Sequence, residues 1–279
     1  GDIYIGITSK PNVIPAMLKV DEARYRPLNW ANPVKDPVYG MEDKDLGNME
    51  GASSPETEDG LFWDMLTDLA LLLRKKGNEL IGNYGPYYQY LAGCSQSGGY
   101  MIRFINEVAD EKELEVPYFD GYYSAGSAGS CMPDLNQGCG RTAMKSSRKL
   151  KKVLQPFLEM HTESENALWG NAESRGVTTF EKEMQYCVYD VPGATHDGKS
   201  TMIDYYLGDV DVFLAGIVPN YPGKETHPKD FPYEVAFQAA LSLLYGWVRD
   251  GRRPFTAEPV RVDEHLVNLV DGSGNAVGG

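Results

Sequence analysis

The chain is poor in residues on which several classes of protein depend. Cysteine is scarce, with 4 in 279 residues, which excludes a disulfide-dense secreted scaffold. Lysine and arginine number 26 against 40 acidic residues, and nucleic acid or an anionic membrane surface would repel the net charge of −14. We therefore expect neither nucleic acid nor a membrane as a partner.

Long apolar runs are also missing. No stretch reaches the roughly 18 apolar residues that indicate a transmembrane helix. The sequence starts at Gly1 without a basic and then apolar leader, so no targeting segment is visible, and we expect a soluble chain of unknown location. Hydrophobic residues nevertheless make up 42% of the chain, which is enough for a sizeable core in one large domain or two small ones.

Only one pair of cysteines is close in sequence. Cys131 and Cys139 flank a loop-like segment, and they could form a small disulfide loop or both stay reduced. A zinc site is not expected, because no second close pair accompanies them.

The order of apolar segments indicates an α/β fold. Runs typical of strands alternate with segments of helical periodicity, which favours a mostly parallel sheet with helices on both faces. The predicted strands are 2–8, 87–92, 116–123, 156–161 and 183–190, and the predicted helices are 13–20, 61–76, 100–108 and 233–249. Two long segments, 29–60 and 124–152, are expected to leave the sheet, and either could form a lid. The basic residues of 141–152 fit a solvated helix face better than a site for an acidic substrate.

The strongest local signal runs from Gly93 to Gly99, between a predicted strand and a predicted helix. It fits the G-x-S-x-G nucleophile elbow, with Ser95 as the nucleophile. Gly93 supplies the small residue that the tight turn needs on one side, and Ser97 supplies a less ideal one on the other. The turn would also point the Gln96 N–H at a substrate oxygen, as one half of an oxyanion hole. An ordinary Gly/Ser-rich turn would look the same, so the motif alone is not decisive.

A serine nucleophile needs a base, and the base needs an orienting acid. In α/β-hydrolases these residues follow in the order serine, acid, histidine. His196 comes just after the predicted strand that ends at Asp190, and it is the preferred base, with His227 as the alternative. His161 precedes the acid and His265 lies in an acidic segment, so neither fits as well.

Two glutamates follow the predicted strand that ends at His161. Glu165 is preferred to Glu163 as the acid, because it lies farther past the strand and can turn back toward the histidine. Both could instead be solvated residues of a polar turn. As catalytic groups they would lie at the carboxyl edge of the sheet, where ligands bind in open α/β folds.

These segments together resemble the "alpha/beta hydrolase domain" group of the α/β-hydrolase superfamily. The resemblance covers nearly the whole chain in order, and in one variant of the acidic turn the last acidic position corresponds to Glu165. The matching segments are a G-x-S-Q-S elbow at 93–97, a Phe-Asp-Gly at 119–121, an acidic turn at 162–165, V-x-G-x-x-H at 191–196, W-V-R-D-G-x-x-P at 247–254 and D-x-x-G-N-x-x-G-G at 271–279.

This resemblance implies that 1–279 is an α/β-hydrolase catalytic domain, the C-terminal part of that fold. The early strands and the loop for a second oxyanion donor look missing from this sequence, so another chain or segment could complete the sheet. The implied activity is hydrolysis of a small-molecule carboxylic ester by Ser95, His196 and Glu165, without a metal or cofactor. The alternatives are a non-catalytic homologue and an acyltransferase with the same triad.

The Gly-Cys-Ser sequence at the elbow is also similar to that of tannase and feruloyl-esterase enzymes. In those enzymes the cysteine bonds a second cysteine beside the catalytic histidine. Here residue 197 is Asp, so we do not expect that disulfide.

Overall fold

The fold of the chain is given by a computed structural model. The structure describes residues 2–7, 13–31, 60–75, 79–82, 84–109, 114–127, 150–169, 176–198 and 231–279. Most of the two predicted excursions, the pair Cys131 and Cys139, and the alternative base His227 lie outside these ranges.

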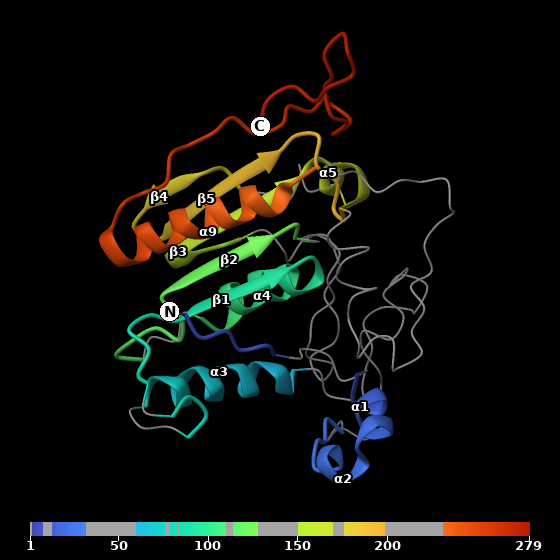
Figure 1. The fold of residues 1–279 in the computed structure, drawn as a ribbon. Coiled ribbons are helices and arrows are strands. Elements are labelled where there is room, and N and C mark those ends of the chain that lie inside the picture. The colour runs from blue at the N-terminus through green and yellow to red at the C-terminus, as the bar shows by residue number, and fades with distance from the viewer. Residues whose placement is uncertain are drawn as a thin grey trace.

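Five strands form the sheet that positions the site. Four of them run parallel, in the order β1, β2, β3, β5, and the short β4 pairs antiparallel with β5 at the edge. Their bounds are Tyr90–Cys94 (β1), Gly121–Ala125 (β2), Val153–Thr162 (β3), Thr179–Glu181 (β4) and Met184–Val191 (β5). The four parallel strands therefore end at the same edge, on the right of Figure 1.

Helices cover both faces of this sheet. α3 and α4 lie on one side of it and α9 lies on the other (Figure 1). The helices in the described part of the chain are Ile14–Val20 (α1), Glu22–Tyr25 (α2), Leu61–Arg74 (α3), Gln96–Glu107 (α4), Glu163–Trp169 (α5) and Tyr233–Asp250 (α9). The prediction of a mostly parallel α/β sheet with helices on both faces is confirmed.

The long helices form where the apolar periodicity predicted them. α3 buries Phe62, Leu66 and Ala70, which are spaced by one helical turn and so lie on one face. Gly251 follows α9 and ends it, since its backbone is left-handed (φ 69°). The Gly251 N–H donates to the carbonyl of Trp247 at 3.0 Å.

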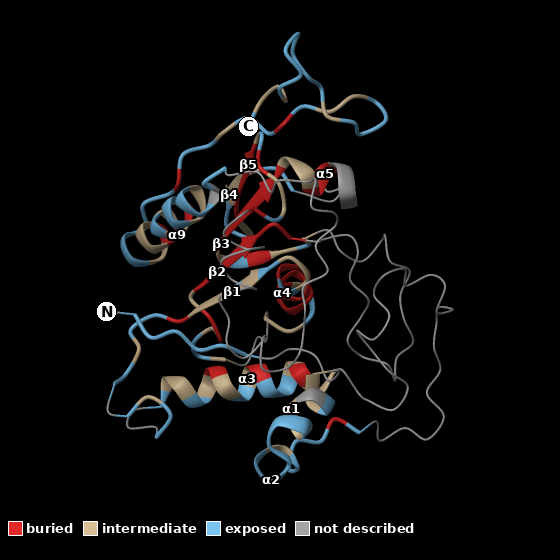
Figure 2. Cartoon of the chain, turned by 45° about the vertical axis from the view of Figure 1, so that its right-hand side comes forward, coloured by how far each residue is buried: buried red, intermediate tan, exposed pale blue. Residues whose placement is uncertain are grey.

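Each face of the sheet has its own core. Successive residues of a strand point to opposite faces, so Phe157 belongs to the core under α3 and α4, while Leu158 packs with Leu244 of α9. These three side chains are all fully buried. Figure 2 shows the buried residues concentrated in the central strands and in α4. The sheet is thus packed on both faces, and this packing fixes the position of the strand ends that carry the site.

One predicted strand is wrong. Residues 2–7, the described part of the run 2–8, form no strand, and Tyr4 is 92% exposed. The run has strand-forming residues, but β propensity forms a strand only where a partner strand supplies hydrogen bonds. No strand in the described part of the chain pairs with it.

Several boundaries also differ from their predictions. β1 begins at Tyr90 instead of residue 87 and β2 begins at Gly121 instead of 116, because the register that joins the two strands pairs Tyr90 with Gly121. α4 begins at Gln96, four residues earlier than expected. The strand β4 was not predicted, and the polar turn expected at 162–165 is the end of β3 followed by α5.

Candidate active site

Ser95 forms the turn between β1 and α4. Its backbone has φ 55° and ψ −121°, a conformation that costs energy for a residue with a side chain. Two hydrogen bonds hold it there, because Ser95 N donates to the Ala125 carbonyl at 3.0 Å and the Ser95 carbonyl accepts from Gly99 N at 3.2 Å. Backbone strain of this kind persists where the surrounding structure fixes it, and it is common at functional sites.

Two glycines make this turn possible. A Cβ atom at Gly93 would lie 2.6 Å from the backbone carbon and oxygen of Ser97, so only glycine fits there. On the helix side the excluded position is Gly98, where a Cβ atom would lie 2.6 Å from the Ser124 Oγ. The expected need for a small residue at 93 is met. Position 98, which the sequence pattern did not single out, carries the second constraint, and Ser97 is exposed.

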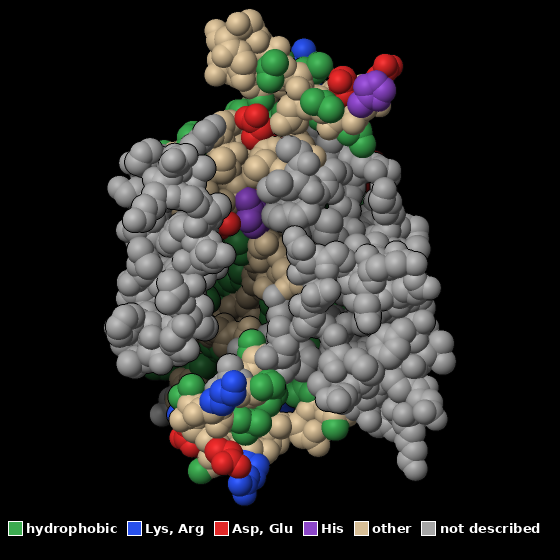
Figure 3. Space-filling view, turned by 90° about the vertical axis from the view of Figure 1, so that its right-hand side faces the viewer, with side chains coloured by type: hydrophobic (Ala, Val, Ile, Leu, Met, Phe, Trp, Pro, Cys, Tyr) green, Lys and Arg blue, Asp and Glu red, His purple; other side chains and the backbone are tan. Residues whose placement is uncertain are grey.

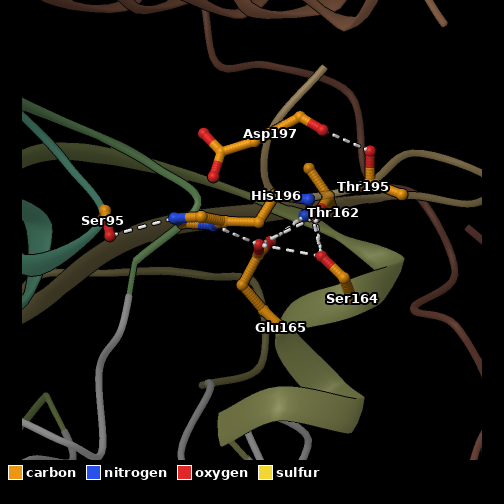
Figure 4. Close-up of polar contacts among 7 residues, drawn as sticks. All are labelled: Ser95, Thr162, Ser164, Glu165, Thr195, His196 and Asp197. Atoms are coloured by element: carbon orange, nitrogen blue, oxygen red, sulfur yellow. Dashed lines mark hydrogen bonds and ion pairs between the residues drawn. The ribbon is translucent and has the colours of Figure 1, made fainter. Parts of the chain in front are cut away.

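His196 lies in the loop after β5 and faces Ser95. Its Nε2 is 3.0 Å from the Ser95 Oγ, and its Nδ1 is 2.7 Å from the Glu165 Oε1 (Figure 4). The three predicted residues therefore form one hydrogen-bonded chain across the carboxyl edge of the sheet. Figure 3 views the molecule from the side of this edge.

Glu165 is held in place by the end of β3. Its side chain is fully buried, and both oxygens accept hydrogen bonds from Thr162. The Thr162 N–H donates to Oε2, and the Thr162 hydroxyl donates to Oε1 at 2.8 Å. Hydrogen-bond donors on both oxygens compensate the carboxylate for its burial. A solvated position for Glu165, the alternative reading of the sequence, is therefore wrong.

Glu163, the other candidate acid, points elsewhere. Its Oε2 accepts a hydrogen bond from the backbone N–H of Gly193 at 2.8 Å. Between the two glutamates, Ser164 accepts a hydrogen bond from the backbone N–H of His196 at 2.6 Å. Of the two acids, the geometry thus brings only Glu165 to the imidazole.

Gly126 lets the histidine approach β2. A Cβ atom at this position would lie 3.2 Å from His196 Nδ1 and 3.6 Å from Glu165 Oε1, and its φ of 55° favours glycine. Sequence reasoning did not single out this residue. The available signal was its place directly after β2, in a run of small residues at the edge where the site lies.

Gln96 is the first residue of α4. Its backbone N–H therefore lies at the N-terminus of this helix, immediately after Ser95. Helix N-termini favour negative charge, because their first N–H groups point away from the helix. This placement agrees with the one expected for an oxyanion donor. A second donor for the same oxygen was not predicted from the sequence.

A thiol and a carboxylate border the site. Burial raises the pKa of the Cys94 thiol, and the nearby carboxylates of Asp197 and Glu165 raise it further. Cys94 and Cys187 are both free cysteines, and no disulfide joins them. Figure 4 shows the Asp197 carboxylate beside the His196 ring, on an exposed residue.

The remaining described histidines lie in other settings. His161 is buried on β3, with its Nε2 3.3 Å from the Glu159 Oε1. His265 is exposed beside Glu264. The Ser95 hydroxyl makes its hydrogen bond with His196 instead. The contact between Glu159 and His161 was not predicted from the sequence, because no local motif marks such a pair inside a strand.

Two features are absent from the described ranges of the chain, a metal-binding cluster and a membrane-spanning helix. Within them, no three His, Cys, Asp or Glu side chains form a group that could hold a metal ion. None of the helices in these ranges is long and apolar enough to cross a membrane.

The sheet order and the position of these residues define a class of protein. A parallel sheet covered on both faces, with a serine at a strained strand-to-helix turn on its carboxyl edge, is the α/β-hydrolase architecture. The family model described as "Alpha/beta hydrolase domain" matches residues 1–279, and the chain belongs to that family. No curated protein and no solved structure matches the chain significantly. Family membership supports hydrolase activity in general, and it confirms the resemblance found in the sequence.

Proposed function

We propose that the protein is a serine esterase, which cleaves a carboxylic ester through an acyl-enzyme on Ser95. The observation that carries this proposal is the chain from Ser95 Oγ to His196 Nε2, at 3.0 Å, and from His196 Nδ1 to Glu165 Oε1, at 2.7 Å. A base within hydrogen-bond reach of a hydroxyl, oriented by a buried acid, is the arrangement that activates serine for acyl transfer.

Glu165 sets the tautomer of the histidine. Its carboxylate accepts the Nδ1–H hydrogen bond, so the lone pair of the neutral ring lies on Nε2. Nε2 can then accept the proton of the Ser95 hydroxyl as the oxygen attacks the ester carbonyl carbon. The carboxylate also stabilises the imidazolium that forms, without taking a proton itself.

The reaction then proceeds in two halves. The oxyanion of the tetrahedral intermediate accepts a hydrogen bond from the Gln96 N–H, and its collapse breaks the ester C–O bond. The imidazolium Nε2–H protonates the leaving alcohol, and the acyl group stays on Ser95 Oγ. Water next attacks the acyl carbon while Nε2 takes its proton, and the proton returns to Ser95 as the carboxylic acid leaves.

Two alternative functions, a non-catalytic homologue and an acyltransferase, predict different observations. A non-catalytic homologue would have no reason to keep the Ser95 hydroxyl within hydrogen-bond reach of an imidazole, so the 3.0 Å distance argues against it. An acyltransferase would use the same residues and differ only in the acceptor. A product assay with an added alcohol separates transfer from hydrolysis.

The test is labelling with a fluorophosphonate, which reacts with an activated serine. The wild-type protein should be labelled on Ser95, as read by mass spectrometry of the modified peptide. Ser95→Ala should lose labelling and should lower kcat on p-nitrophenyl acetate by about 10⁴- to 10⁶-fold.

The matched control is Ser97→Ala, which removes the neighbouring hydroxyl and should leave labelling intact. A folded wild-type protein that neither takes the label nor hydrolyses the ester would refute the proposal. So would equal labelling of the wild-type protein and Ser95→Ala.

A further inference from the structure

We infer that Ser164 and Glu163 are positioning residues for His196, so that the first turn of α5 holds the base as well as carrying the acid. The inference rests on the proposed function, since it assigns a role relative to the same reaction. Neither residue touches the atoms that would react, and both act through the loop that carries His196.

Three consecutive side chains of α5 reach this loop. Glu163 accepts from Gly193 N at 2.8 Å, Ser164 accepts from His196 N at 2.6 Å, and Glu165 bonds the ring of His196 at 2.7 Å. The loop that carries His196 is therefore held at three points, which are Gly193 near its start, the backbone of His196 and the imidazole ring of His196. Figure 4 shows Ser164 and Glu165 converging on His196 from the start of α5.

Packing alone would hold the loop poorly. Gly193 is exposed, and a Cβ atom there would have no neighbour within 4 Å. Gly193 also has a φ of 77°, a conformation that a glycine leaves easily. The hydrogen bonds from α5 therefore add to the hold of the buried Ala194, whose N–H donates to the Val191 carbonyl at 3.3 Å.

Ser164 also links the backbone of the base to the carboxylate of the acid. Its hydroxyl oxygen accepts from His196 N, and it lies 3.0 Å from the Thr162 Oγ1, which in turn donates to Glu165. A shift of the loop would therefore change the imidazole and its acid together. Removing the Ser164 hydroxyl leaves the His196 N–H without this partner and frees the ring to move relative to Ser95.

The helix that carries these residues is itself anchored. The Asn268 side chain donates to the Glu163 carbonyl at 3.4 Å, and it accepts from the Asn166 side chain at 3.2 Å. The segment after α9 thus fixes the start of α5, and α5 fixes the loop. Hydrogen bonds therefore connect the C-terminal segment to α5, and α5 to the backbone of His196.

The first test compares Ser164→Ala with Ser164→Thr, which keeps the hydroxyl. Displacements of about 1 Å can cost on the order of a hundredfold in rate. We expect Ser164→Ala to lower kcat on p-nitrophenyl acetate by about ten- to a hundredfold with little change in KM, and Ser164→Thr to recover most of it. The control Ser242→Ala removes a hydroxyl that donates to the Gln238 carbonyl on α9 and should match the wild-type rate.

A second measurement does not depend on activity. The Nδ1–H proton of His196, hydrogen-bonded to Glu165, should give a downfield ¹H NMR resonance that is absent from His196→Gln. This resonance should broaden or disappear in Ser164→Ala and stay in Ser242→Ala. If Ser164→Ala does not fold, Glu163→Ala against Glu163→Gln repeats the comparison, because glutamine keeps an acceptor for Gly193 N.

The results decide the two proposals separately. Unchanged kcat and an unchanged imidazole resonance in Ser164→Ala would overturn the positioning role while leaving the esterase proposal intact. A loss that Ser164→Thr fails to restore would also overturn it. If the wild-type protein reacts with neither the label nor the ester, the esterase proposal falls, and the resonance alone decides whether α5 positions the histidine.

Discussion

The carboxylate of Glu165 and the ring of His196 lie 2.7 Å apart, although 31 positions separate them in the chain. Each follows a strand of the same sheet, Glu165 after β3 and His196 after β5, and these two strands are direct neighbours. Their parallel pairing brings the two strand ends together, so the contact is a consequence of topology. The acid is fully buried and the base partly exposed, as a site open to substrate on one side requires.

The first prediction separates the two glutamates. Glu165→Gln should lower kcat on p-nitrophenyl acetate by about 10⁴-fold, because an amide can donate to Nδ1 and favour the tautomer that cannot accept the Ser95 proton. Glu163→Gln should stay within about threefold of the wild type, because its amide oxygen can still accept from Gly193 N. The reverse ranking of the two variants would show that the acid is misassigned.

The second prediction concerns the tight turn at Ser95. Gly93→Ala should destabilise the protein by about 1–3 kcal/mol or more, because the added Cβ atom would overlap the backbone of Ser97. Urea unfolding measures the change, and labelling by the fluorophosphonate should fall with it. The same substitution at Gly272, where nothing lies within 4 Å of the new atom, should be nearly neutral. Equal stability of both variants would argue against the close approach of β1 and α4.

The third prediction tests the core under α9. Leu244→Ala should cost about 2–5 kcal/mol, because Leu244 is fully buried against the sheet and its removal leaves a cavity. Val235→Ala, on the same helix but 63% exposed, should cost far less. Urea unfolding of the two variants gives the comparison. A similar loss at both positions would mean that α9 does not pack as described.

The fourth prediction follows from the buried pair on β3. Burial by itself opposes charge on both groups, but their charge attraction, their hydrogen bond and the neighbouring groups together outweigh it, so the pKa of Glu159 is lowered and the pKa of His161 is raised. Tyr186 also donates to Glu159, and the negative charges of Asp190 and Glu165 support the proton on His161. The pair is therefore charged over a range of pH that includes the interval between the ordinary values of 4.5 and 6.5.

The sign of the pH dependence follows from these directions. The contribution of His161 is complete below its ordinary pKa of 6.5 and is lost as the pH rises through its raised value. The contribution of Glu159 is complete above 4.5 and is lost as the pH falls through its lowered value. The free energy of unfolding lost in Glu159→Gln should therefore be largest between about pH 4.5 and 6.5, on the order of 3–5 kcal/mol. A loss that does not vary with pH would contradict the charged pair.

Some elements could be read directly from the chain. The helices α3 and α9 were predicted because their apolar residues repeat at the helical spacing. A basic last turn marks the end of α3, and Gly251 marks the end of α9. The strand ends were predicted less well. β1 and β2 begin where their mutual register begins, at Tyr90 and Gly121, and local propensity does not contain that information.

The candidate site divides in the same way. Ser95, Glu165 and His196 were proposed from their order in the sequence and from their place after predicted strands. Gly98, Gly126, Thr162 and Ser164 were not given roles, because the sequence around each residue does not show which segment it contacts. Each became important only when another segment came close to it, such as β2 to Gly98 and the His196 loop to Ser164.

The sequence by itself determined the alternation of strands and helices, the glycine and serine turn at 93–99, and the order of serine, acid and base. These are local properties, set by side-chain periodicity and by the backbone freedom of glycine. Only the tertiary structure decided that Glu165 faces the imidazole while Glu163 holds the backbone of Gly193. The two glutamates lie two positions apart at the start of α5, and residues at that spacing on a helix do not face the same way, so they reach different parts of the His196 loop.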